Sequence, residues 1–71
     1  MVITSDQLAE LVRNGGSASV DANDYAPTQL IDVARSMPAK VTLILRKAEA
    51  LLTAQRIEIA RSSGGTVLFE L

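Results

Sequence analysis

The sequence repeats one short pattern three times, and this repeat restricts the possible folds more than any other feature. Related blocks occupy residues 7–14, 29–36 and 55–62. Each block starts with glutamine, has an acidic residue in fourth place and arginine in seventh, and ends on Asn or Ser. Blocks of this kind predict stacked copies of one unit of supersecondary structure, because neighbouring copies bury a continuous core.

Each block has the periodicity of a helix. At about 100° per residue, the apolar residues fall on one side of the helix and the charged residues on the other. The expected inward residues are Leu8, Leu11 and Val12 in the first block, Leu30, Val33 and Ala34 in the second, and Ile59 and Ala60 in the third. Arg56 stands where the first two blocks have leucine, and Leu51 and Leu52 are expected to fill the resulting gap.

The ends of the helices carry their own signals. Residues 4–7 have the pattern of a capping box, and Pro27 suits the first position of a helix. Glycine pairs or a proline follow the blocks, as expected where helices stop. The start of the third helix has two interpretations. Thr53 suits a cap, but residues 46–52 are good helix formers, which would start the helix near Arg46 instead.

A short run of strand-forming residues follows each helix, at 18–22, 41–45 and 67–71. A further, very short strand is expected at residues 2–3. Strands that alternate with helices pair in parallel through right-handed crossovers, which place all helices on one side of the sheet. We therefore expect an α/β fold of three helix–strand repeats. The small parallel sheet has its helices on one face, forming one solenoid-like, two-layer domain over residues 1–71, with units at about 4–22, 26–45 and 50–71.

Three stretches, at 29–35, 41–43 and 57–71, carry a resemblance to short bacterial helix–strand repeat proteins of uncharacterised function. The last stretch matches the usual ending of these proteins most closely. Arg56 departs from their pattern, which usually has an acidic or polar residue at that place. The resemblance implies a fold and no reaction, so it assigns no functional residue.

The composition restricts the function. The chain has no histidine or cysteine, and Tyr25 and Phe69 are its only aromatic residues. We therefore expect no disulfide, no cofactor and no metal site of the usual nitrogen and sulfur type. Asp6, Asp21 and Asp24 lack the spacing of a calcium-binding loop. We expect no enzyme and no catalytic residue, because acid–base chemistry near neutral pH usually needs histidine or a buried carboxylate.

The charge and hydropathy patterns indicate which partners and which cellular location to expect. The net charge of −1 argues against a broad surface for nucleic acid or for an anionic membrane, since both require a positive field. No apolar run approaches the length of a membrane-spanning helix. The first residues lack the basic and apolar regions of a secretory signal. We therefore expect a cytoplasmic protein without membrane contact.

Two polar columns follow from the repeat. The first column consists of Gln7, Gln29 and Gln55. The second column, the arginine row, consists of Arg13, Arg35 and Arg61. The glutamines are expected to cap their helices rather than to bind a ligand. The arginines either pair with the acidic residue three positions earlier or bind anionic groups. Together with Arg46, Lys47 and Arg56, they support the alternative function of a small nucleic-acid-associated regulator.

The sheet face turned away from the helices is the main candidate interface. Period-two alternation places on this face Ser19, Asp21, Thr42, Ile44, Leu68 and Glu70. Ile44 and Leu68 are expected to be neighbours on adjacent strands. Parallel sheets normally have both faces covered, and open edges pair readily, although isolated surface aliphatics need no explanation. The preferred interpretation is a non-enzymatic interaction module, most simply a homodimer formed through the sheet face or an edge strand. Another protein partner is the alternative.

Overall fold

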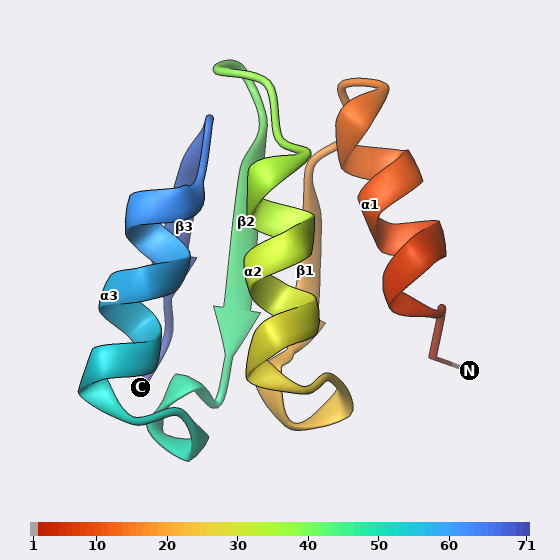
Figure 1. Cartoon of the computed structure of the whole chain (residues 1–71). Coiled ribbons are helices and arrows are strands. Elements are labelled where there is room, and N and C mark those ends of the chain that lie inside the picture. Colours follow the sequence, from red (N-terminus) through yellow and green to blue (C-terminus); the bar gives the residue numbers. More distant parts are fainter. Residues whose placement is uncertain (1) are drawn as a thin grey trace.

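The computed structural model describes residues 2–71 and shows three helix–strand units side by side (Figure 1). The helices are α1 (Ser5–Arg13), α2 (Pro27–Arg35) and α3 (Thr53–Ser62). The strands are β1 (Ala18–Asp21), β2 (Thr42–Arg46) and β3 (Thr66–Phe69). Short 3₁₀ helices at Ala22–Asp24 and Ala48–Ala50 connect each of the first two strands to the next helix. The first unit is α1–β1, the second α2–β2 and the third α3–β3.

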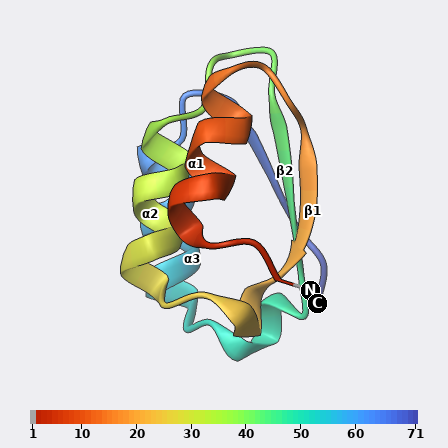
Figure 2. The same ribbon diagram turned by 90° about the vertical axis from the view of Figure 1, so that its right-hand side faces the viewer.

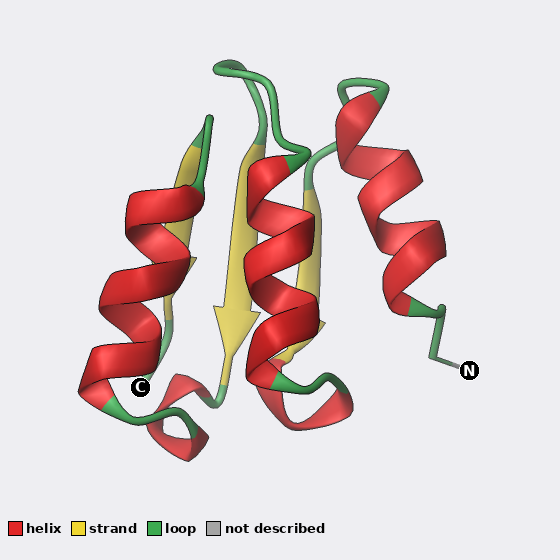
Figure 3. Cartoon of the chain, in the orientation of Figure 1, coloured by secondary structure: helices red, strands yellow, loops and turns green. Residues whose placement is uncertain are grey.

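The three strands form a parallel sheet in the order β1-β2-β3. The helices all cover one side of the sheet, and the other side is bare (Figures 2 and 3). This arrangement confirms the expected two-layer α/β fold. Each strand lies beside the strand of the next unit because the intervening helix returns the chain to the same end of the sheet.

The repeated glutamine has the same structural task in all three units. Gln7, Gln29 and Gln55 are each the third residue of their helix. Each side-chain Oε1 accepts a hydrogen bond from the backbone N–H of the N-cap residue, at 2.9, 2.8 and 2.8 Å respectively. At the first helix, Thr4 Oγ1 also accepts from the N–H of Gln7 at 3.1 Å, which completes the predicted capping box.

The third helix begins at Thr53, and the alternative start near Arg46 is wrong. Residues 42–46 form the central strand, so Arg46 extends the sheet instead of starting a helix. Lys47 then adopts a left-handed conformation with φ of 57°, which interrupts any regular element. Thr53 is itself the first helical residue, and Leu52 holds the capping position. Strand pairing thus overrides helix propensity at Arg46, and residues 48–50 form only a short 3₁₀ helix.

The core lies between the sheet and the helix layer and is almost entirely aliphatic. The largest fully buried side chains are Leu8, Val12, Leu30, Val33, Val41, Leu43, Leu45 and Ile59. Leu51, one of the two leucines expected near Arg56, is also buried. Complete burial of one such side chain contributes about 1.5–3 kcal/mol. Burial of these side chains therefore provides most of the free energy that holds the three units together.

Several inward assignments are wrong at the two ends of the stack. Leu11 is 45% exposed, and Ala60 is exposed as well. Leu52 points to solvent, unlike Leu51. Leu71, which was expected to end the third strand, lies beyond the end of β3 and is exposed. The expected strand at residues 2–3 does not form, and this segment is irregular.

The loop between α3 and β3 is packed closely against the second unit. Gly64 donates its N–H to Ala34 O at 3.3 Å, and Thr66 donates to Val41 O at 3.0 Å. A Cβ atom at Gly65 would overlap Val41 O and lie 2.7 Å from Pro38 O. Glycine is required here because another stretch of backbone occupies the space that a side chain would need.

Candidate interaction surfaces

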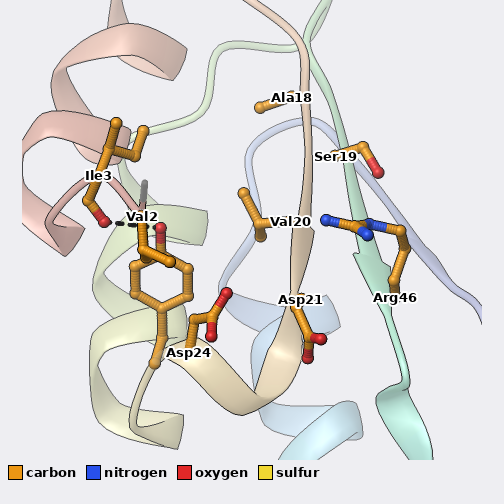
Figure 4. Close-up of a pocket in the computed structure, with 9 residues that line it drawn as sticks. Val2, Ile3, Ala18, Ser19, Val20, Asp21, Asp24 and Arg46 are labelled. Atoms are coloured by element: carbon orange, nitrogen blue, oxygen red, sulfur yellow. Dashed lines mark hydrogen bonds between the residues drawn. The ribbon is translucent and has the colours of Figure 1, made fainter.

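The open sheet face is the first candidate surface. Ala18 and Val20 point toward the helix layer, and Ser19 points away from it (Figure 4). Ser19, Ile44 and Leu68 are partners in the register of adjacent strands. The prediction that Ile44 and Leu68 are neighbours on adjacent strands is therefore confirmed. Leu68 is 50% exposed, while Ile44 is half-buried. The apolar patch on this face is therefore small.

The rest of the open face is polar. Thr42 is half-buried, and Glu70 is exposed just beyond the end of β3. Asp21 accepts a hydrogen bond from the Asn23 N–H at 2.8 Å and lies 3.6 Å from the Lys47 ammonium group. The Asn23 N–H and the charge of Lys47 hold the pKa of Asp21 below its ordinary value of 3.8. Asp21 thus fixes the turn after β1.

A groove of about 330 Å³ runs along the outer edge of β1 (Figure 4). The strand forms one wall, and Val2 and Ile3 form the other. Tyr25 also lines the groove, and its hydroxyl donates a hydrogen bond to Ile3 O at 2.8 Å. Burial, together with the nearby Asp24 carboxylate, raises the pKa of Tyr25 above its ordinary value of 10.0. β1 is an edge strand, so the backbone groups on its outer side have no partner strand in the sheet.

The arginine row is accompanied by acidic residues. Arg35 lies 3.7 Å from Asp32 and Arg61 lies 3.6 Å from Glu58, and Arg13 makes the corresponding ion pair with Glu10. The side chains of all three pairs are largely exposed, so each pair contributes only about 0.2–0.5 kcal/mol. The structure places the arginines at the ends of their helices, where a positive charge also suits the helix dipole.

The outer side of the third unit has an apolar hollow of about 290 Å³, called here the α3 hollow. Its lining consists of Thr53, Arg56, Ile57, Ala60 and Phe69. Ile57 is 51% exposed. Arg56 donates from Nη2 to Thr53 Oγ1 at 3.3 Å, while its Nε is buried without a hydrogen-bond partner. A buried N–H group of this kind is costly unless an acceptor reaches it.

The outer side of the first unit carries a partly exposed apolar side chain, Leu11. Leu11 projects from α1 beside a shallow depression, called here the α1 flank, lined by Gln7, Glu10, Leu11, Asn14 and Gly16. The helical periodicity assigned Leu11 and Ala60 to the core and did not single out Ile57. The repeat contains the signal that would have identified them, because a terminal unit lacks one of its two neighbours.

Comparison of the chain with protein families, with curated proteins and with solved structures finds no match. No helix within residues 2–71 is both long enough and apolar enough to cross a lipid bilayer.

Proposed function

We propose that the chain is a non-enzymatic protein-interaction module that associates with further copies of itself. The observation that supports this proposal is the set of apolar side chains left uncovered on the outside of the stack. They include Leu11 on α1, Ile57 on α3 and Leu68 on β3, each roughly half exposed. Covering such side chains is favourable in proportion to the apolar area removed from water.

The topology of the sheet supports the same proposal. Parallel sheets are usually covered on both faces, but here helices cover only one face. β1 and β3 are edge strands, whose unpaired backbone groups are available to another chain. A typical stable interface buries about 800 Å² on each partner, which is roughly a fifth of the 4182 Å² surface of this chain. A small core gains much from a contact of that size.

The alternative of a nucleic-acid-associated regulator has less support from the geometry. Binding to phosphates requires positive charge that is available to the ligand. Glu10, Asp32 and Glu58 lie beside the three arginines of the row and oppose their charge. These ion pairs do not weaken the self-association proposal, because the side chains that support it are the uncharged Leu11, Ile57 and Leu68.

Sedimentation velocity over a wide range of micromolar concentrations tests the proposal. We expect the average mass to rise above that of the 7.6 kDa monomer as the concentration increases. Thr28→Asp is a suitable control, because Thr28 is exposed in the first turn of α2, away from the uncovered apolar side chains. The control is expected to associate like the unmodified chain. A constant monomer mass at every concentration would overturn the proposal.

A further inference from the structure

The three helices can be compared position by position, because the glutamine in third place fixes their alignment. Leu11, Val33 and Ile59 are equivalent in this alignment. Val33 and Ile59 are fully buried, whereas Leu11 is 45% exposed. The second and third units each have a preceding unit beside them, and the first unit has none among the described residues. This position is therefore the one that packs against the preceding unit.

The opposite pattern holds for the next position of the repeat. Val12 and Ala34 are fully buried, while the equivalent Ala60 is exposed. Ile31 is half-buried, and its equivalent Ile57 is 51% exposed. Among residues 2–71, the third unit is the one without a following neighbour. These positions therefore face the following unit.

Within the molecule, each inter-unit contact has the same two parts. Val33 and Ile59 are fully buried and their helices contact the helices of the preceding units, so we take the preceding unit to supply the surface that receives each side chain. In the third unit, the corresponding receiving surface is the α3 hollow, which also includes Phe69 at the strand position equivalent to Val20 and Leu45. The described residues thus present the α3 hollow on one side of the stack and the 45% exposed Leu11 on the other.

We infer that copies of this chain stack head to tail, with Leu11 of one copy seated in the α3 hollow of the next. The contact repeats the geometry of the two contacts inside the molecule. It also places β1 of one copy beside β3 of the other, so that the parallel sheet continues across the interface. This inference rests on the proposed self-association and names the surfaces that mediate it.

The charges at the two ends agree with this arrangement. Arg56 belongs to the α3 hollow and has no carboxylate partner among residues 2–71, and its Nε lacks an acceptor. Glu10 lies on the α1 flank next to Leu11. Head-to-tail stacking brings Glu10, which already pairs with Arg13 in its own copy, toward an arginine whose Nε has no acceptor.

A two-fold symmetric dimer would use these surfaces less well. Two-fold symmetry places the same surface of both copies in contact. It would oppose Leu11 to Leu11, or bring Arg56 and the α3 hollow against their own equivalents. In neither pairing does Leu11 enter the α3 hollow.

Variants blocked at one end provide the decisive experiment. Leu11→Asp removes the inserting side chain and leaves the α3 hollow intact, whereas Ile57→Asp does the reverse. Both residues are about half exposed, so both variants are expected to fold, which circular dichroism checks. We expect each variant alone to be monomeric in sedimentation velocity. An equimolar mixture is expected to form a dimer and nothing larger, because one functional surface of each kind remains.

The unmodified chain is expected to grow beyond a dimer as its concentration rises. Should Leu11→Asp or Ile57→Asp alone still associate like the unmodified chain, stacking through these surfaces is wrong, although self-association stands. Loss of association in Leu68→Asp but not in the two end variants would assign it to the sheet face and overturn the inference. A monomeric unmodified chain overturns both proposals.

A second measurement does not depend on the aspartate variants. The chain has no cysteine, so Leu11→Cys together with Ala60→Cys introduces one thiol at each end. Oxidation is expected to produce a ladder of crosslinked chains from the double variant. Each single variant alone is expected to give no ladder. A double variant that stops at a crosslinked dimer would contradict open-ended stacking.

Discussion

At the scale of single residues, the repeated glutamines are explained by local structure. Each one closes a hydrogen bond to the backbone at the start of its helix, which leaves its Oε1 engaged rather than free for a ligand. At α2 and α3 the N-cap residues, Ala26 and Leu52, cannot accept a bond through their own side chains. The glutamine is therefore the one side chain that helps to satisfy these two helix starts.

Gln29 provides a test of this assignment. Gln29→Ala removes the acceptor of the Ala26 N–H and is expected to lower the free energy of unfolding by about 0.5–1.5 kcal/mol. Gln29→Glu keeps an acceptor at the same place and adds a negative charge at the helix start, so it is expected to retain the full stability. Urea unfolding compares the two variants. Equal losses in both would contradict a capping role.

Tyr25 provides a second test, in which pH is the variable. Its pKa is higher in the folded chain than the ordinary 10.0, so folding favours the neutral hydroxyl. This contribution to stability is fully present below the unfolded pKa and is lost as the pH rises through the folded pKa. Tyr25→Phe loses the hydrogen bond to Ile3, at a cost of about 1 kcal/mol, and is expected to lose this alkaline dependence too.

The ultraviolet titration of Tyr25 measures the shift directly, because it is the only tyrosine in the chain. We expect the folded protein to titrate at higher pH than the urea-unfolded chain. Identical titration in both states would show that burial does not affect this hydroxyl.

At the scale of elements, the sequence was sufficient for the kind and order of the helices and strands but not for every face. The periodicity of α1 assigns Leu11 to the core as clearly as it assigns Leu8, yet only Leu8 is covered. Whether such a residue is buried depends on the next unit, which lies outside the local pattern. The helix propensity of Arg46 failed as a predictor for a similar reason, because pairing with β1 determined the conformation of this residue.

The loop before β3 shows how closely these elements fit. Gly65→Ala would force a methyl group against the carbonyl oxygens of Val41 and Pro38. We expect this change to lower the melting temperature and to cost about 1–3 kcal/mol, as overpacking usually does. Thr66→Ala is the matched control, since Thr66 is exposed and its backbone bond to Val41 remains. Comparable losses in the two variants would argue against a steric role for Gly65.

At the scale of the whole molecule, the candidate surfaces were only partly predictable. The alternation correctly placed Ile44 beside Leu68, because register follows from the repeat. The α3 hollow was missed, because its residues come from a helix and a strand whose mutual position the sequence pattern does not give. Open surfaces of a repeat are a property of the stack and become visible only once the units are assembled.

The middle unit holds the other two in place. β1 and β3 each pair with β2, and α1 and α3 each contact α2. A terminal unit can therefore detach while the remaining two stay packed, whereas opening of the middle unit releases both neighbours at once. Heat or mechanical force should accordingly unravel the chain from its outer units inward, and a copy docked on either end would close off that route.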